Sequence, residues 1–312
     1  MRSFLLLVAL LVAAGAAALA WSFAPATLAV GPPPKLVRPP AHPAEGMRLS
    51  ALPAGKMFSQ AVFAYRGGAL GEPRVFAMTG ILVQHPRGTL LFDTGFGKDV
   101  DVQVRSTPWL MHLLTRYEKG TPVAEQLRAH GIGPKDLAGI VLTHAHWDHV
   151  SGIPDLSGAP VWVSRAERDF IRDGGVATAL VRGFGDLPYH VYDFGSGPYL
   201  GFDRSEDVFG DGSIVLVPAP GHTPGSIIAF LALPSGKRFA LVGDLVWQKE
   251  GVELPAERPW LSRSLADADP AGVRRWIVLM HQIQIAMPDL VIVPAHDSRV
   301  LERLAKFPEW VG

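Results

Sequence analysis

Four side chains of metal-binding type follow a short apolar run, and this cluster restricts the fold of the 312-residue chain more than any other feature. The run 139–142 is typical of a buried strand. Side chains two positions apart in extended chain point the same way, so His144 and His146 can reach one metal ion. Asp148 and His149 follow as the chain turns and can reach a second ion. Imidazole and carboxylate are the usual protein ligands of zinc and also bind other transition metals.

Three further candidate ligands share one property, which is that each lies just past the end of a predicted strand. They are His222 after the strand 214–217, Asp244 after 238–242 and His296 after 290–293. A single loop histidine or a single strand-ending aspartate is often a plain hydrogen-bonding residue. Because strand ends at one edge of stacked sheets can converge on one pocket, we interpret all three together with the first cluster as ligands.

The composition allows one large domain and disfavours several classes of protein. Hydrophobic residues make up 48% of the chain, which is enough for one core of about 250 residues. The 29 basic and 29 acidic residues cancel and form no block of like charge, so nucleic acid is not expected as a partner. The absence of cysteine excludes disulfides, iron–sulfur sites and cysteine nucleophiles.

The N-terminus is apolar, with no charged residue between Arg2 and Lys35. Residues 18–20 resemble a signal-peptide cleavage site, yet apolar character continues to Val30 and is long enough to span a bilayer. Residues 1–30 are therefore either a signal peptide or an N-terminal membrane anchor. Both interpretations predict export, with a domain that is periplasmic or held outside the cytoplasm by a membrane tether. Residues 31–46 are predicted to be a stiff, Pro-rich linker that holds the domain 47–312 away from the membrane.

Two predicted hairpins share a plan of apolar strand, Pro/Gly turn, apolar strand and a final aspartate beside glycine. They cover 79–92, ending in Asp93, and 226–242, ending in Asp244. This weak repeat suggests two similar halves. Another strand is predicted at 61–65, a long loop at 248–269, and helices at 122–130, 166–172 and 270–286. The mixture indicates sheets covered by helices on the outside.

Over residues 57–300 these motifs resemble the metallo-β-lactamase superfamily, and Asp93-Thr94-Gly95 also matches an early strand-end motif of that family, in which the aspartate supports the site. The resemblance implies an α+β fold, the αββα sandwich of two similar halves. It also implies two zinc ions, with other divalent transition metals as alternatives. The implied ligands are His144, His146 and His222 for one ion, Asp148, His149 and His296 for the other, and Asp244 between them.

The implied activity is that of a metal-dependent hydrolase acting on a small molecule. A hydroxide that bridges the two metals would cleave an ester, lactone or thioester-type bond, with Asp148 as the catalytic residue that orients it. The alternatives are hydrolysis of a β-lactam or a phosphodiester at the same site, or a non-catalytic metal-binding protein of this fold. The sequence predicts no oligomeric state.

The motifs look most similar to the acyl-homoserine lactonase and glyoxalase II-like branches, with one departure. Lactonases commonly carry tyrosine three residues after the bridging aspartate, where Trp247 stands in this chain, and an indole has no hydroxyl group. Trp147 and Trp247 are predicted substrate contacts, whereas Trp109 and Trp260 either line the pocket or pack at the rims. Arg258 is predicted either to meet an anionic group or to be solvated.

Overall fold

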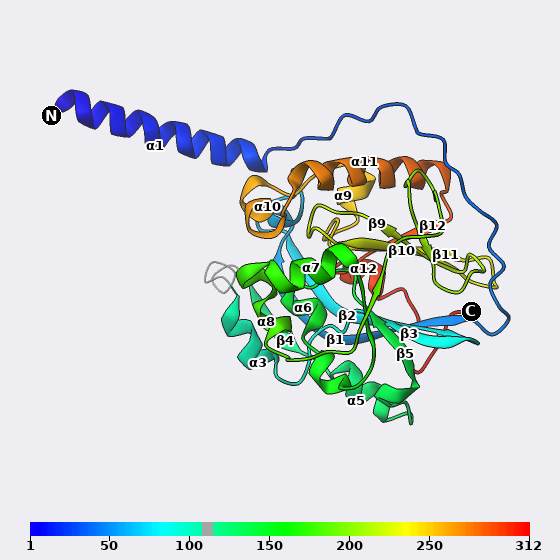
Figure 1. Ribbon diagram of the computed structural model, residues 1–312. Helices are drawn as coiled ribbons and strands as arrows, with labels where there is room; N and C mark the ends of the chain where they lie inside the picture. The colour runs from blue at the N-terminus through cyan, green and yellow to red at the C-terminus, as the bar shows by residue number, and fades with distance from the viewer. Residues whose placement is uncertain (108–114) are drawn as a thin grey trace.

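Two β-sheets pack face to face with helices outside them (Figure 1). The structure is a computed structural model that describes residues 1–107 and 115–312. Within these residues the larger sheet has the strand order β4 (Arg116–Lys119), β1 (Arg48–Gln60), β2 (Pro73–His85), β3 (Gly88–Phe92), β5 (Leu137–Val141), β6 (Val161–Ser164) and β7 (Tyr189–Tyr192). The smaller sheet has the order β12 (Leu290–Pro294), β11 (Arg238–Gly243), β10 (Ile227–Ala232), β9 (Ile214–Pro218) and β8 (Glu206–Asp207).

The alternation of side chains along the strands builds three apolar layers. In β3, Leu90 and Phe92 join the layer between the two sheets, whereas Leu91 joins the outer layer of the larger sheet. In β9, Leu216 lies between the sheets and Val217 joins the outer layer of the smaller sheet. Both faces of each sheet are therefore buried, as the period of two requires. The predicted four-layer αββα sandwich is confirmed.

Helices cover the outer face of each sheet. The long helix α11 (Pro270–Ala286) packs on the smaller sheet through residues such as Ile277 and Met280. The larger sheet is covered by α5 (Val123–Arg128), α7 (Arg165–Asp173) and α8 (Ala179–Arg182). Short helices lie in the connections, namely α3 (Val100–Gln103), α6 (Trp147–Val150) and α12 (Ser298–Leu301).

The two predicted hairpins occupy equivalent places in the two sheets. β2 and β3 pair antiparallel and β3 pairs parallel with β5, while β10 and β11 pair antiparallel and β11 pairs parallel with β12. The backbone turns alike at both ends, because Asp93 has φ of 53° and Gly243 has φ of 52°. The repeat that the sequence suggested is therefore present in the topology, and it brings equivalent strand ends to one edge of the sandwich.

Two predicted elements differ from the structure. The strand predicted at 61–65 is wrong, because β1 ends at Gln60 opposite Pro73 and the chain then forms the single helical turn α2 (Ala61–Ala64). Proline has no N–H to extend the ladder beyond that point. The predicted loop 248–269 contains two short helices, α9 (Glu250–Glu253) and α10 (Trp260–Ala266).

The N-terminal helix α1 (Arg2–Phe23) projects from the domain (Figure 1). Its 18-residue apolar window has a mean hydropathy of 2.5, and none of that window is buried. By length and composition it could cross a membrane.

Residues 24–46, which include the predicted Pro-rich linker 31–46, run along the domain surface (Figure 1). The amide of Leu28 donates to the carbonyl of Pro255 at 2.8 Å, and the side chain of Gln282 donates to the carbonyl of Gly31 at 2.9 Å. An extended chain leaves its amide groups free to donate such bonds and its carbonyl groups free to accept them. The segment is therefore packed against the domain.

Candidate metal centre

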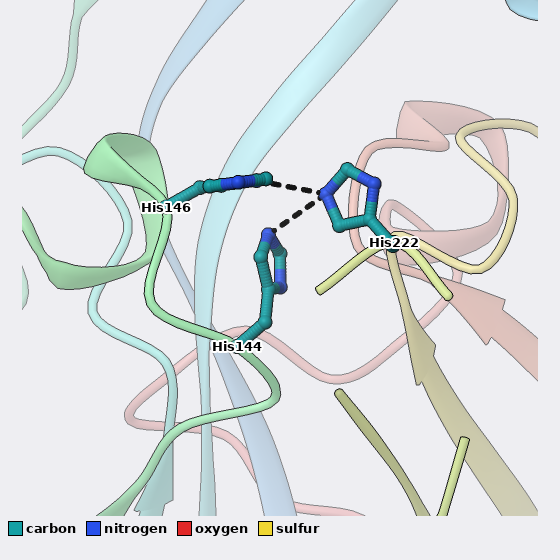
Figure 2. Close-up of side chains that lie close together, drawn as sticks. All are labelled: His144, His146 and His222. Carbon is teal, nitrogen blue, oxygen red and sulfur yellow. Dashed lines mark hydrogen bonds between the residues drawn. The ribbon is translucent and has the colours of Figure 1, made fainter. Parts of the chain in front are cut away.

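Three histidines from two loops bring their ring nitrogens together (Figure 2). His144 and His146 lie in the turn between β5 and α6, and His222 follows β9. Nε2 of His222 lies 2.9 Å from Nδ1 of His146 and 3.1 Å from Nε2 of His144. The three imidazoles provide donor atoms within 4.8 Å of one another, which suits one cation.

A second group forms around two carboxylates at the same edge of the sandwich. Nε2 of His296 lies 3.4 Å from Oδ2 of Asp148 and 3.0 Å from Oδ1 of Asp244. Nε2 of His149 lies 3.4 Å from the same Asp244 oxygen. The other oxygen of Asp244 lies 3.4 Å from Nε2 of His222. Asp244 therefore lies between the two groups and turns one oxygen toward each.

The remote ring nitrogens of three histidines are held by hydrogen-bond acceptors. These acceptors are Oδ1 of Asp267 for His222 (3.0 Å), Oδ2 of Asp93 for His149 (2.8 Å) and the carbonyl of Ala77 for His296 (2.9 Å). Each acceptor calls for a proton on Nδ1, which leaves the lone pair on Nε2. The three lone pairs therefore face the cluster, as ligation requires.

Two buried polar atoms in the cluster lack hydrogen-bond partners among the residues that the structure describes. They are Nε2 of His149 and Oδ1 of Asp244. Buried polar atoms in proteins are nearly always paired, because leaving one unpaired costs about 1–3 kcal/mol. A lone-pair nitrogen facing a carboxylate oxygen cannot satisfy either atom, whereas a cation would satisfy both. The donor set therefore fits divalent metal ions.

The pKa values differ between the two groups. Burial, together with neighbouring histidines, holds the pKa of His144 and of His146 well below the usual value. Burial also opposes charge on His149, but the carboxylates of Asp93 and Asp244 outweigh it and raise the pKa of His149 well above its usual value. Desolvation of Asp244 is likewise outweighed by neighbouring histidines, so its pKa is well below the ordinary one. His144 and His146 are therefore neutral and ready to donate, whereas the carboxylates around His149 favour a positive charge there, in the position that a metal ion would take.

Asp93 lies where the sequence placed it, at the end of β3 and behind the ligands. Its carboxylate accepts from the amide of Thr143 at 2.8 Å and from the hydroxyl of Thr143 at 2.7 Å, besides holding His149. A positive φ is uncommon for a residue with a side chain. The turn at Asp93 is thus fixed by bonds to the loop that carries the first cluster.

Sequence reasoning missed Asp267, which holds His222. Asp267 lies in the loop before α11, and nothing in its local sequence distinguishes it. It also forms a buried ion pair with Arg258, whose Nη1 donates to the carbonyl of Asp244 at 2.9 Å. Arg258 is only 3% exposed, so it is not a solvated charge, and the anionic group that it contacts is Asp267.

Glu167 was also missed, although it joins the two histidine loops. Its buried carboxylate accepts from the amide of Ala145 at 2.6 Å, from the hydroxyl of Thr223 at 2.7 Å and from the amide of Gly225 at 3.0 Å. Burial raises the pKa of Glu167 to about 7, although the three donors oppose that shift. The spacing of Ser164 and Glu167 is that of a capping box, which would suggest a role at the start of α7 only.

A cavity of about 410 Å³ opens onto both groups. Its wall is largely apolar and includes Met57, Phe63, Phe76, Leu180, Leu261 and Leu265. Trp147 and Trp247, which are predicted substrate contacts, both line this cavity. However, the indole N–H of Trp247 donates to Oδ2 of Asp244 at 2.8 Å. Trp260 is exposed on α10, and Trp109 lies outside the described residues.

Known proteins resemble this chain in sequence and in fold. A family model described as the metallo-beta-lactamase superfamily matches residues 77–296. The N-acyl homoserine lactonase AttM of Agrobacterium fabrum is 25% identical over 73% of this chain and 85% of its own length. A probable metallo-hydrolase of Mycobacterium tuberculosis is 30% identical over 70% of this chain and 73% of its own length.

Two solved structures share the fold. One is an N-acyl homoserine lactone hydrolase with the product N-hexanoyl-L-homoserine bound at its catalytic metal centre, with a TM-score of 0.66 and 19% identity over 85% of this chain and 98% of that chain. The other is AidC, a dizinc quorum-quenching lactonase, with a TM-score of 0.57 and 17% identity over 86% of this chain and 91% of that chain.

Proposed function

The chain belongs to the metallo-β-lactamase superfamily and is a metal-dependent hydrolase, and from this we propose that it binds two zinc ions and cleaves an ester, lactone or thioester-type bond. The observation that carries the proposal is the convergence of seven donor side chains on two adjoining points. His144, His146 and His222 would hold one ion, and Asp148, His149 and His296 the other, with Asp244 shared between them.

When bound, the ions supply positive charge that lowers the pKa of water and polarises a carbonyl oxygen. The residues of the chain supply position and proton transfer. Asp148 lines the cavity, so its carboxylate can take the proton of the attacking water and pass it to the leaving alkoxide. The new bond joins the water oxygen to the carbonyl carbon, and the bond from that carbon to the leaving oxygen, or to the leaving sulfur of a thioester, breaks. Asp93 and Asp267 keep His149 and His222 oriented during the reaction.

The cavity favours a substrate with an apolar acyl group. Its wall is aliphatic and aromatic next to the metal site, as in pockets that hold an apolar ligand by a few polar contacts. The similar AttM proteins are N-acyl homoserine lactonases, which supports a lactone or ester over a β-lactam or phosphodiester. Trp247 has its N–H engaged by Asp244, so the substrate carbonyl must be held by other groups than this indole.

A hydrolysis panel tests the bond class. The full chain in detergent, loaded with zinc, would be given a long-chain acyl lactone, a thioester, an aryl ester, a phosphodiester and a β-lactam, each with and without chelator. We expect chelator-sensitive acid release from the lactone or ester. Release from the phosphodiester or β-lactam alone would contradict the proposed bond class, and no turnover by a metal-loaded chain would favour a non-catalytic role.

Substitution of the ligands tests the site itself. We expect His146→Ala and Asp148→Ala to reduce hydrolysis to background and to lower the bound metal, measured by elemental analysis, because each removes a donor that no neighbour replaces. His190→Ala is the matched control, since His190 is exposed and stacks on Trp162 away from the site. Wild-type turnover by either ligand variant would refute the assignment.

A further inference from the structure

The apolar helix α1 ends on the same part of the domain as the cavity. At 22 residues it is about 33 Å long, close to the hydrocarbon thickness of a bilayer. None of its apolar window is covered by the described part of the chain. By its length and apolar surface, α1 suits a lipid bilayer.

The end of α1 is bound to the domain by several contacts. The guanidinium of Arg66 donates to the carbonyl of Trp21 at 2.9 Å and lies over its indole at 4.6 Å. The hydroxyl of Ser22 accepts from the amide of Trp260 at 2.6 Å. The ring of Phe23 meets the ring of Phe63 edge to face, with centroids 6.1 Å apart. These contacts fix which face of the domain lies next to the helix end.

The elements that hold α1 also form one wall of the cavity. Phe63 of α2 lines the cavity, and so do Leu261 and Leu265 of α10. The hydroxyl of Ser262 donates to the carbonyl of Phe63 at 2.7 Å and ties the two elements together. In Figure 1, α1 projects from the side of the domain where α10 lies, and α8, which also contributes to the cavity wall, is on that side of the view.

The mouth of the cavity is apolar and faces outward. Leu265 and Val176 both line the cavity, yet they are 53% and 79% exposed, which marks the opening. Beside it, Trp21 and Trp260 are 67% and 54% exposed. Tryptophan gathers at the boundary between lipid and water, because its ring is apolar and its N–H is polar. The mouth and the end of α1 are therefore suited to the same depth of a membrane surface.

We propose that the cavity opens at the surface of the membrane that α1 enters, and that it takes a long-chain acyl ester or lactone directly from that leaflet. This inference rests on the proposed hydrolase function and adds the source of its substrate. The acyl chain would pass along Leu265 and Phe63, while the ester group reaches the metal site at the inner end of the cavity. A substrate of this kind is concentrated in lipid and scarce in water, so an opening at the membrane gives access that an opening toward water would not.

The first test uses the wild-type full chain reconstituted in phosphatidylcholine vesicles. 4-Nitrophenyl palmitate is placed either in the vesicles that carry the enzyme or in a separate population of vesicles. We expect turnover to be at least about ten-fold faster when enzyme and ester share a vesicle, a ratio that corresponds to about 1.4 kcal/mol. Equal rates in the two arrangements would overturn the proposal.

A variant tests the mouth. Trp260→Glu puts a charge beside the opening without touching the ligands or the cavity wall, and Ile285→Glu puts the same charge on an exposed site of α11. We expect only Trp260→Glu to slow hydrolysis of the vesicle-borne palmitate, while both variants keep wild-type turnover of soluble 4-nitrophenyl butyrate. Equal behaviour of the two variants on palmitate would contradict the proposal.

The short-chain ester distinguishes a failure of the membrane route from a failure of the proposed hydrolase function. Turnover of the butyrate, without any preference for shared vesicles, would leave the hydrolase function standing and remove the membrane route. Failure of the metal-loaded chain to cleave either ester would remove the proposed ester hydrolysis itself.

Discussion

At the scale of single residues, Trp247 shows how a side chain can lie in a cavity and still act on the metal site. Its N–H is used by Asp244, and its ring stacks under the guanidinium of Arg258 at 4.8 Å. We expect Trp247→Phe, which keeps a ring but removes the donor, to weaken metal binding by about 10-fold, as is usual for groups that orient ligands. Competition with a chromophoric chelator measures this affinity. Slower turnover with unchanged metal affinity would instead indicate that the N–H serves the substrate.

Glu167 predicts a pH dependence of stability. Its pKa is about 7 in the folded chain against an ordinary pKa of 4.5 for glutamate, so between these values the folded state holds a proton that the unfolded chain has lost. The stability from this group is therefore present at low pH and is lost as the pH rises through about 7. In urea unfolding of the metal-free chain, we expect the advantage of wild type over Glu167→Gln to shrink by on the order of 2 kcal/mol from about pH 5 to about pH 8.

The Gln variant is its own control, because it keeps the shape of the side chain and does not titrate in this range. The histidines of the cluster titrate in both proteins and cancel in the difference. A difference that stays constant or grows with pH would show that the three donors and not burial set the protonation of Glu167.

At the scale of elements, the start of α11 holds the loop that carries His222. Asp269 caps the helix by accepting from the amide of Ala271 at 3.0 Å, and its own amide donates to the carbonyl of Gly221 at 2.7 Å. We expect Asp269→Ala to lower the free energy of unfolding by about 1 kcal/mol, the usual value of an N-cap. Asp289 is exposed in the turn after α11 and provides the control Asp289→Ala. This control should change the free energy of unfolding by less than about 0.5 kcal/mol. Equal losses in both variants would contradict a capping role.

The elements also show what a sequence can and cannot predict. The convergence of the candidate ligands was predictable because each follows an apolar strand, and strand ends meet at one edge of a sandwich. The helical turn α2 was not predictable, because a run of five apolar residues fits a strand and a helix equally well. Asp267 and Glu167 depend on partners 45 and 22 or more positions away, which only the folded chain brings together. The direction of the Trp247 N–H is likewise set by the fold.

At the scale of the whole molecule, we propose that the apolar N-terminus holds the domain at a membrane. We expect the full chain, expressed in a bacterial host, to stay in the membrane pellet after carbonate washing and to be sensitive to protease added outside the inner membrane. Mass analysis of the purified chain would show whether Met1 to Ala20 is retained. A chain that begins at Trp21 and is found in the soluble periplasm would support a cleaved signal peptide in place of an anchor.

The packed course of residues 24–46 has a consequence for how such a domain searches for its substrate. A flexible, unpacked chain of this length would have an end-to-end distance of roughly 26 Å. It would let the cavity face in any direction. In this structure the segment is packed on the surface of the domain, so the cavity keeps one orientation relative to α1. With α1 in a bilayer, collisions are then governed by lateral diffusion and by the surface density of substrate. The rate of hydrolysis would depend on the density of substrate in the leaflet, and hardly at all on the volume of the surrounding water.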